Sequence, residues 1–203
     1  RQMCIRDRGS YEISLAIEQL YTPGDANGWS QANSDRLFTT DYTNYAGYAH
    51  VKGNFKFTSA LNWDGVNYGF AGDGKLSNDG GAGNLVAPAE GLCFLQANIA
   101  SLTYSISAPV TTYGLIGAAT PNGWDASTAL TPSANEMVWE GDVAMKGGEY
   151  KFRANDAWDI NLGGSIDNLT QDAGNLMFSE PDGTYHVVLD LSTYPAKATF
   201  TKK

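Results

Sequence analysis

The chain has 203 residues and a net charge of −9, from 13 basic and 22 acidic side chains. Such a chain lacks the basic stripe that nucleic acids and anionic membrane surfaces require, and no apolar run approaches the ~20 residues of a membrane-spanning helix. With 42% hydrophobic and 17% charged residues, its composition is that of a packed globular protein. Two Cys and two His are too few to support a disulfide framework, a zinc site or a Ser-His-Asp triad.

The first eight residues, RQMCIRDR, resemble translated sequencing-adapter sequence at the ends of some environmental reading frames. We therefore interpret residues 1–10 as a non-native segment and exclude them from fold prediction. On this interpretation Cys4 carries no functional information and the true N-terminus is unknown.

The rest of the chain contains one pattern twice. The offset between the copies is 95 residues for the first three motifs and falls to 91 by the last. A period of this length suits β-sandwich domains of about 100 residues. We predict one domain at 11–108 and a second at 109–203, joined by a short Pro-containing junction that restricts their orientation. The recurring motifs are Gly28-Trp29 with Gly123-Trp124, Phe55-Lys56-Phe57 with Tyr150-Lys151-Phe152, Trp63-Asp64 with Trp158-Asp159, Asn67-Tyr68-Gly69 with Asn161-Leu162-Gly163, and Gly83-Asn84-Leu85 with Gly174-Asn175-Leu176.

Alternating apolar residues predict strands throughout, and no helix of more than two turns is evident. The expected fold class is all-β, as two tandem immunoglobulin-like β-sandwich domains. Within these strands Tyr45, Cys93 and Trp139 are predicted to be core residues, Cys93 as a small buried hydrophobe and not a nucleophile. The expected strands are 45–51, 54–58, 92–99, 138–145, 150–153 and 184–191.

Several recurring residues are not needed by either core. Four Trp fall in turn sequences or Asn- and Asp-rich stretches, and the alternation places Lys56, Lys151 and Arg153 on the solvent face of their strands. Exposed indoles beside hydrogen-bonding side chains favour a sugar-binding platform, because pyranose rings have apolar C–H faces and polar rims. The candidate residues are Trp29, Lys56, Trp63 and Asn84 in the first copy, and Trp124, Lys151, Arg153, Trp158 and Asn175 in the second.

Each of these residues has a simpler interpretation. A Trp in a β-sandwich often belongs to the core or packs a turn, and an outward Lys is usually only a solvated charge. The binding hypothesis depends on all of these elements recurring together in the same order. The alternative is a structural spacer in a surface complex, in which the paired Trp residues are buried.

The motifs resemble the starch-binding domains of SusE and SusF, cell-surface outer-membrane lipoproteins of Bacteroidetes. The resemblance runs from about Leu20 to Phe200 and includes the segments 21–29, 55–57, 62–65 and 83–85 and their second-copy counterparts. A similar pattern also occurs in accessory β-sandwich modules of pullulanase-like enzymes.

The resemblance implies non-catalytic immunoglobulin-like domains in which two aromatic rings form an arc along an α-glucan helix, while a Lys or Arg and an Asn contact the sugar hydroxyls. Trp29 with Trp63 and Trp124 with Trp158 would form the arcs. Whether Lys151 or Arg153 contacts the sugar stays open. The resemblance also implies starch or maltooligosaccharides as ligand, other outer-membrane glycan-uptake proteins as possible partners, and a cell-surface location. The N-terminal lipid-attachment Cys and the further N-terminal β domain of the family are not found in this sequence.

Other chemistries have less support. A glycosidase needs two carboxylates flanking the scissile bond, and only the Asp after each Trp, Asp64 and Asp159, recurs at the candidate site. The oxygen-rich stretch 155–161 lacks the Gly and Glu of a calcium loop. We therefore predict no catalytic residues, no cofactor and no metal. An accessory module of an α-glucan hydrolase is a further alternative.

Overall fold

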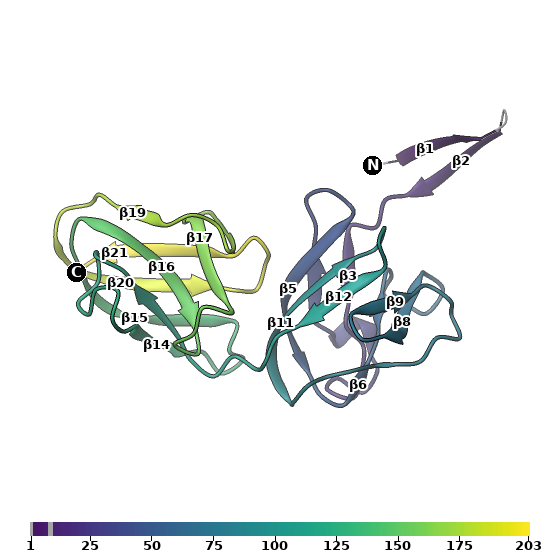
Figure 1. Cartoon of the computed structure of the whole chain (residues 1–203), viewed down its shortest axis with the longest axis horizontal. Coiled ribbons are helices and arrows are strands. Elements are labelled where there is room, and N and C mark those ends of the chain that lie inside the picture. The colour runs from purple at the N-terminus through teal and green to yellow at the C-terminus, as the bar shows by residue number, and fades with distance from the viewer. Residues whose placement is uncertain (1, 8–9) are drawn as a thin grey trace.

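The computed structural model describes residues 2–7 and 10–203, with side chains from residue 16 onward (Figure 1). The predicted all-β class is confirmed, because the described chain forms strands throughout and its only helical element is the 3-10 turn η1 (Gln31–Asn33). Among the described residues, no helix combines the length and apolar character that crossing a membrane requires.

Strands from residue 19 to residue 106 pair only with one another, and we call them the first β unit. Eight of them form a sheet that closes on itself in the order β11-β12-β9-β8-β7-β3-β4-β5, while β6 pairs with β10 beside it. The bounds are β3 (Gln19–Tyr21), β4 (Arg36–Phe38), β5 (Asn44–Val51), β6 (Asn54–Phe55), β7 (Phe57–Thr58), β8 (Asn67–Gly72), β9 (Lys75–Ser77), β10 (Leu85–Val86), β11 (Gly91–Asn98) and β12 (Thr103–Ile106).

The second β unit contains the strands from residue 113 to residue 202. Its nine strands follow the order β18-β17-β16-β13-β14-β15-β20-β21, with β19 paired to β16. The bounds are β13 (Tyr113–Ile116), β14 (Thr128–Pro132), β15 (Val138–Met145), β16 (Gly148–Ala154), β17 (Asn161–Ser165), β18 (Asn168–Gln171), β19 (Leu176–Phe178), β20 (Gly183–Asp190) and β21 (Lys197–Lys202). The first and second β units lie side by side in Figure 1.

Near the start of the chain, β1 (Gln2–Asp7) and β2 (Ser10–Leu15) pair antiparallel. The non-native origin of residues 1–10 stays a prediction, and residues 1 and 8–9 of that segment lie outside the described residues. The domain boundaries at 11–108 and 109–203 also stay predictions.

The predicted core residues are buried. Tyr45, Cys93 and Trp139 are no more than 2% exposed, and burial raises the pKa of the Cys93 thiol to about 11, which keeps it protonated and unreactive. On β11, however, Leu92 and Phe94 are buried as well as Cys93, so both faces of this strand are covered. Alternation along 92–99 predicted only one buried face.

The second face of β11 is buried because it packs against the second β unit. Leu92, Phe94 and Tyr48 belong to the same hydrophobic cluster as the core of the second unit. The Tyr48 and Tyr113 hydroxyls hydrogen-bond at 2.8 Å, and the Phe94 and Tyr194 rings lie 5.5 Å apart. One face of β5 and β11 therefore belongs to the hydrophobic core of the second unit, while the interior of the first unit forms a separate cluster.

Asn155 of the second unit fixes the junction between the units. Its Oδ1 accepts hydrogen bonds from the Thr111 N–H at 2.8 Å and the Thr112 N–H at 3.3 Å, and its Nδ2 donates to the Pro109 carbonyl at 2.9 Å. These bonds hold the junction against the unit that follows it. They anchor the junction at its second-unit end, and the restricted orientation that a short Pro-containing junction implies stays a prediction.

His50 contacts a carboxylate of each unit. Its Nδ1 lies 2.9 Å from the Asp35 Oδ2 of the first unit, and its Nε2 lies 3.7 Å from the Glu136 Oε2 of the second. The hydrogen bond to Asp35 is the main reason that the pKa of His50 is raised above its ordinary value. The protonated imidazole therefore stabilises the folded chain.

This gives a pH-dependent stability. Because the pKa of His50 is higher in the folded than in the unfolded chain, its contribution is complete below the ordinary His pKa of about 6.5 and is lost as the pH rises through the raised value. The difference in unfolding free energy between wild type and His50→Gln, measured by urea denaturation, should shrink over that rise. Glu136→Gln should keep most of the pH dependence and Asp35→Asn should remove it. If the difference in unfolding free energy between wild type and His50→Gln stays constant with pH, protonated His50 does not stabilise the folded chain.

Candidate functional site

The four paired Trp residues lie in connections between strands. Trp29 lies between β3 and β4, and Trp63 between β7 and β8. Trp124 lies between β13 and β14, and Trp158 between β16 and β17. The turn sequences around these residues correctly predicted that they would not extend the strands.

Each predicted Trp pair comes together in space. The Trp29 and Trp63 ring centroids lie 6.2 Å apart with an interplanar angle of 36°, and the Trp124 and Trp158 centroids lie 6.3 Å apart with an angle of 31°. We call these pairs the first platform and the second platform. Each platform is formed by two loops, and although these loops differ in length between the units, the rings have nearly the same arrangement in both.

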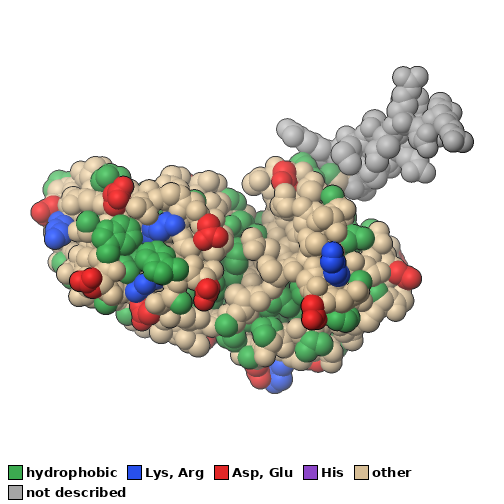
Figure 2. Space-filling view, in the orientation of Figure 1, with side chains coloured by type: hydrophobic (Ala, Val, Ile, Leu, Met, Phe, Trp, Pro, Cys, Tyr) green, Lys and Arg blue, Asp and Glu red, His purple; other side chains and the backbone are tan. Residues whose placement is uncertain are grey.

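The rings are open to solvent. Trp63, Trp124 and Trp158 are 44%, 41% and 50% exposed, and Trp29 is half-buried. Figure 2 shows exposed hydrophobic side chains on the second unit beside Lys or Arg side chains, with Asp or Glu side chains around them. This exposure contradicts the buried indoles that the structural-spacer alternative requires.

Trp29 is held in an unusual backbone conformation. Its φ is 63°, a left-handed value that a bulky residue adopts only when its surroundings enforce it. Its N–H donates to the Gly24 carbonyl at 2.8 Å, and its indole Nε1 donates to the Asp25 Oδ1 at 2.9 Å. The loop therefore fixes both the backbone and the ring of Trp29.

Asp25 is a site residue that the sequence did not predict. Its carboxylate accepts a hydrogen bond from the Asn54 N–H at 2.7 Å as well as from Trp29, and these two bonds lower its pKa. The residue 95 positions later is Thr120, so a search for recurring residues passes over Asp25. This anchor belongs to the first platform alone.

The second platform has a different support, Arg153. The guanidinium carbon lies 5.1 Å from the centre of the Trp158 ring, and Nε donates to the Ser127 Oγ at 2.7 Å. Nη2 lies 3.6 Å from the Asp156 Oδ1. Arg153 is only 7% exposed, so the prediction of a solvent-facing cation is wrong for this residue, because Trp158 covers it. The residue 95 positions earlier is the buried Thr58.

The two recurring lysines lie on the predicted side of their strands, away from the buried Phe and Tyr rings. Both are half-buried. The Lys56 Nζ donates to the Ala82 carbonyl at 2.6 Å, and the Lys151 Nζ donates to the Asn161 Oδ1. Each ammonium group therefore uses one of its three N–H donors within the protein and keeps the others for a ligand or water.

Asn67 and Asn161 hold the loops that carry the second Trp of each platform. The Asn67 Nδ2 donates to the Trp63 carbonyl at 2.9 Å, and the Asn161 Nδ2 donates to the Trp158 carbonyl at the same distance. Neither Asn was predicted as a site residue. The signal was present, because Asn67-Tyr68-Gly69 and Asn161-Leu162-Gly163 are among the recurring motifs.

Asn84 and Asn175 are both exposed, in the loops that precede β10 and β19. The Asn175 Nδ2 donates to the Glu149 Oε2 at 3.2 Å. The residue before each Asn accepts a backbone bond of 2.8 Å, Gly83 from the Phe70 N–H and Gly174 from the Gly164 N–H. These bonds place the two loops in the same way in both units.

The described residues contain no group of three or more His, Cys, Asp or Glu side chains placed to hold a metal ion.

Comparison with protein families matches residues 18–108 to a domain of unknown function, DUF8037. No curated protein matches the chain. Among solved structures, the crystal structure of SusF from Bacteroides thetaiotaomicron matches with 19% sequence identity and a TM-score of 0.39. The match covers 93% of this chain and 50% of that one, so the chain spans half the length of that structure.

In each unit a strand glycine lies close to the loop that carries Asn84 or Asn175, and replacing that glycine tests the close approach. A Cβ on Gly163 would lie 2.2 Å from the Gly174 carbonyl oxygen, and a Cβ on Gly69 would lie 2.3 Å from that of Gly83. Gly163→Ala and Gly69→Ala should each reduce the unfolding free energy by about 1–3 kcal/mol, the usual cost of overpacking. Urea denaturation measures this reduction.

Gly174→Ala and Gly83→Ala are the matched controls, because a Cβ at either position meets nothing within 4 Å. Each control should change the unfolding free energy by no more than about 0.5 kcal/mol. Equal effects of both substitutions within a pair would contradict the described loop placement.

Proposed function

We propose that the chain is a non-catalytic glycan-binding protein whose two platforms bind neutral α-glucan of the starch class. The observation that carries the proposal is the repetition of one ring geometry in two units. The centroid separations are 6.2 and 6.3 Å and the interplanar angles 36° and 31°, although the loops differ in length and share only short motifs. A structural role for the indoles would not require the same exposed arrangement twice.

The tilt between the rings favours a curved ligand. Two coplanar rings would favour a flat ligand, whereas rings inclined by 36° and 31° form a shallow arc in each unit. The apolar C–H faces of successive glucose units in a helical α-glucan can lie on such an arc. The absence of net positive charge in the chain, at −9, also suits a neutral ligand.

Each unit also carries polar side chains that we propose supply hydrogen bonds at the edge of the sugar. We assign this role to Lys56 and Asn84 in the first unit and to Lys151 and Asn175 in the second. Of the two candidate cations in the second unit, Lys151 is the better sugar contact, because Arg153 is covered by Trp158. Arg153 is then a positioning residue that orients the Trp158 ring.

Each platform alone should bind weakly, with a Kd of about 10 μM to 1 mM, or about 4–7 kcal/mol. Stacking on two half-exposed rings and a few solvent-accessible hydrogen bonds supports no more than that. A polymer that reaches both platforms would gain avidity. The hydrophobic packing of Tyr48, Leu92 and Phe94 against the second unit limits the separations that the two platforms can adopt, which favours glycan chains whose shape fits.

We further propose that the protein acts at the cell surface, where it holds α-glucan for neighbouring glycan-uptake proteins of the outer membrane. The support for this location is the resemblance of the recurring motifs to SusE and SusF domains. An accessory role beside an α-glucan hydrolase would use the same platforms.

The platforms can be tested by removing one ring from each. Trp63→Ala with Trp158→Ala should weaken binding to amylopectin by at least tenfold, which corresponds to about 1.4 kcal/mol, because each arc loses half of its stacking surface. Isothermal titration calorimetry or affinity electrophoresis measures the loss, with a non-starch polysaccharide as the specificity control. Circular dichroism should stay native, since both side chains are exposed.

The matched control is Trp63→Phe with Trp158→Phe, which keeps a flat aromatic face at both positions. It should retain most of the binding. Unchanged affinity of the double Ala variant would exclude the platforms as the binding sites, and absence of binding by the wild type to any α-glucan would exclude the proposed function.

A further inference from the structure

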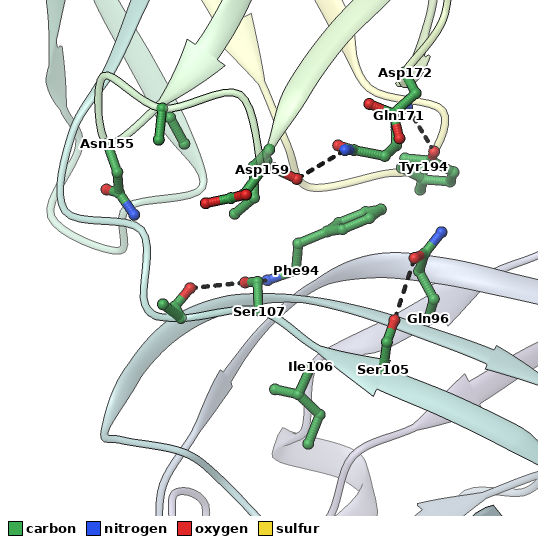
Figure 3. Close-up of a pocket in the computed structure, with 14 residues that line it drawn as sticks. Phe94, Gln96, Ser105, Ile106, Ser107, Asn155, Asp159, Gln171, Asp172 and Tyr194 are labelled. Atoms are coloured by element: carbon green, nitrogen blue, oxygen red, sulfur yellow. Dashed lines mark hydrogen bonds between the residues drawn. The ribbon is translucent and has the colours of Figure 1, made fainter. Parts of the chain in front are cut away.

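A cleft of about 560 Å³ lies between the two β units, apart from both platforms (Figure 3). One wall comes from β11 and β12 of the first unit, and the other comes from loops and β18 of the second unit. The volume falls in the range of small-molecule sites, roughly 300–1,000 Å³. Its walls carry the polar or aromatic side chains of Gln96, Ser105, Asp159, Gln171, Asp172 and Tyr194.

The polar groups of the cleft are only partly used by the protein. Within the described residues, Gln96 accepts a hydrogen bond from the Ser105 hydroxyl through Oε1, and its Nε2 makes none. Asp172 accepts from Asn161 through Oδ1, and the Asp159 carboxylate takes part in no hydrogen bond or ion pair among those residues. The cleft therefore offers carboxylate acceptors on one wall and an amide donor on the other.

Two aromatic rings are among the residues that line the cleft. The rings of Phe94 and Tyr194 lie 5.5 Å apart and come from different units. Phe94 is 5% exposed, while Tyr194 is half-buried and presents part of its ring to the cleft. A mixture of an aromatic face with carboxylate and amide groups is suited to a ligand with both C–H faces and hydroxyl groups.

The cleft is connected to the second platform by the chain itself. Ala157 and Asp159, which line the cleft, are the neighbours of Trp158 on either side. The Gln171 Nε2 donates to the Asp159 carbonyl at 2.9 Å, and the Gln171 Oε1 accepts from the Asn161 N–H at 3.2 Å. The loop that presents Trp158 outward therefore also forms one wall of the cleft.

We propose that this cleft is a third glycan subsite, which binds the part of an α-glucan chain that extends past the Trp158 ring toward the first unit. Sugar hydroxyls donate to the Asp159 and Asp172 carboxylates and accept from the Gln96 amide. The inference rests on the proposed function of the second platform and extends it. A divalent cation is the less favoured occupant, because only two carboxylates line the cleft and no metal-binding group of three exists among the described residues.

The test uses the Trp63→Ala background, in which the first platform has lost one of its two rings and the second platform and the cleft are intact. In that background, calorimetry compares an α-1,4-glucan trisaccharide with a decasaccharide. Ser105→Arg fills the cleft from the first unit's wall, away from Trp124 and Trp158. It should weaken decasaccharide binding by at least threefold and leave trisaccharide binding unchanged.

Ser101→Arg is the matched control. It makes the same substitution at an exposed position in the β11–β12 turn that does not line the cleft, and it should change neither affinity. Gln96→Ala is a second variant that removes the amide donor without adding bulk, and it should weaken the decasaccharide alone. Thermal unfolding of each variant establishes that it is folded.

The outcomes separate the two proposals. If Ser105→Arg and Gln96→Ala bind the decasaccharide as the Trp63→Ala parent does, while Trp158→Ala in the same background loses both ligands, the cleft proposal is overturned and the platform stands. If the wild type binds neither ligand, both proposals are overturned. A thermal shift by millimolar Ca²⁺ that Asp159→Asn abolishes, with no effect of the cleft variants on the decasaccharide, would replace the glycan by a cation.

Discussion

Each exposed platform depends on a side-chain amide that fixes the backbone of a loop. Leaving half of an indole in water forgoes on the order of 2 kcal/mol of burial, so a loop that could fold its ring inward would do so. Asn67 and Asn161 prevent this, because each donates to the carbonyl of the Trp that its loop carries. Asn67 is the first residue of β8, and Asn161 is the first residue of β17. Each therefore ties the loop that carries Trp63 or Trp158 to a strand of the sheet.

The same ring geometry is reached with different supporting chemistry in the two units. In the first unit a carboxylate, Asp25, accepts the indole N–H of Trp29. In the second unit a guanidinium, Arg153, lies over the face of Trp158. The hydrogen bond holds the Trp29 ring by its edge, whereas the cation covers one face of Trp158 and leaves the other for a ligand. The second platform is therefore open to a ligand from one side only at Trp158.

Much of this fold and part of the site could be predicted from the sequence. Residues that recur in both copies of a duplicated chain indicate the positions that both units need. The turns around Trp63 and Trp158, and the buried faces of the strands around Tyr150 and Phe152, follow from alternation and turn composition. The pairing of the Trp rings was implied by the resemblance to SusE and SusF domains, and the rings do lie together. The features that could be predicted are those whose residues recur in both copies of the sequence.

What the sequence did not predict lies where the two copies differ or where they meet. Asp25 has no counterpart in the second copy, and the burial of Arg153 depends on where the neighbouring Trp ring falls. The burial of Leu92 and Phe94 on β11 depends on packing between units, which alternation within one strand does not encode. Contacts between elements distant in sequence leave no local pattern.

The packing of β11 also determines how the two platforms can act together. Because Tyr48 and Phe94 complete the interior of the second unit, the units cannot separate without exposing that interior to water. Two binding sites on a flexible linker accept many spacings, whereas two sites on one rigid body accept few. A fixed arrangement of the two units therefore accepts fewer glycan shapes and discriminates better between them. A glycan chain that binds both platforms at once must already have the right curvature, and the loop that carries Trp158 also lines the cleft between the units.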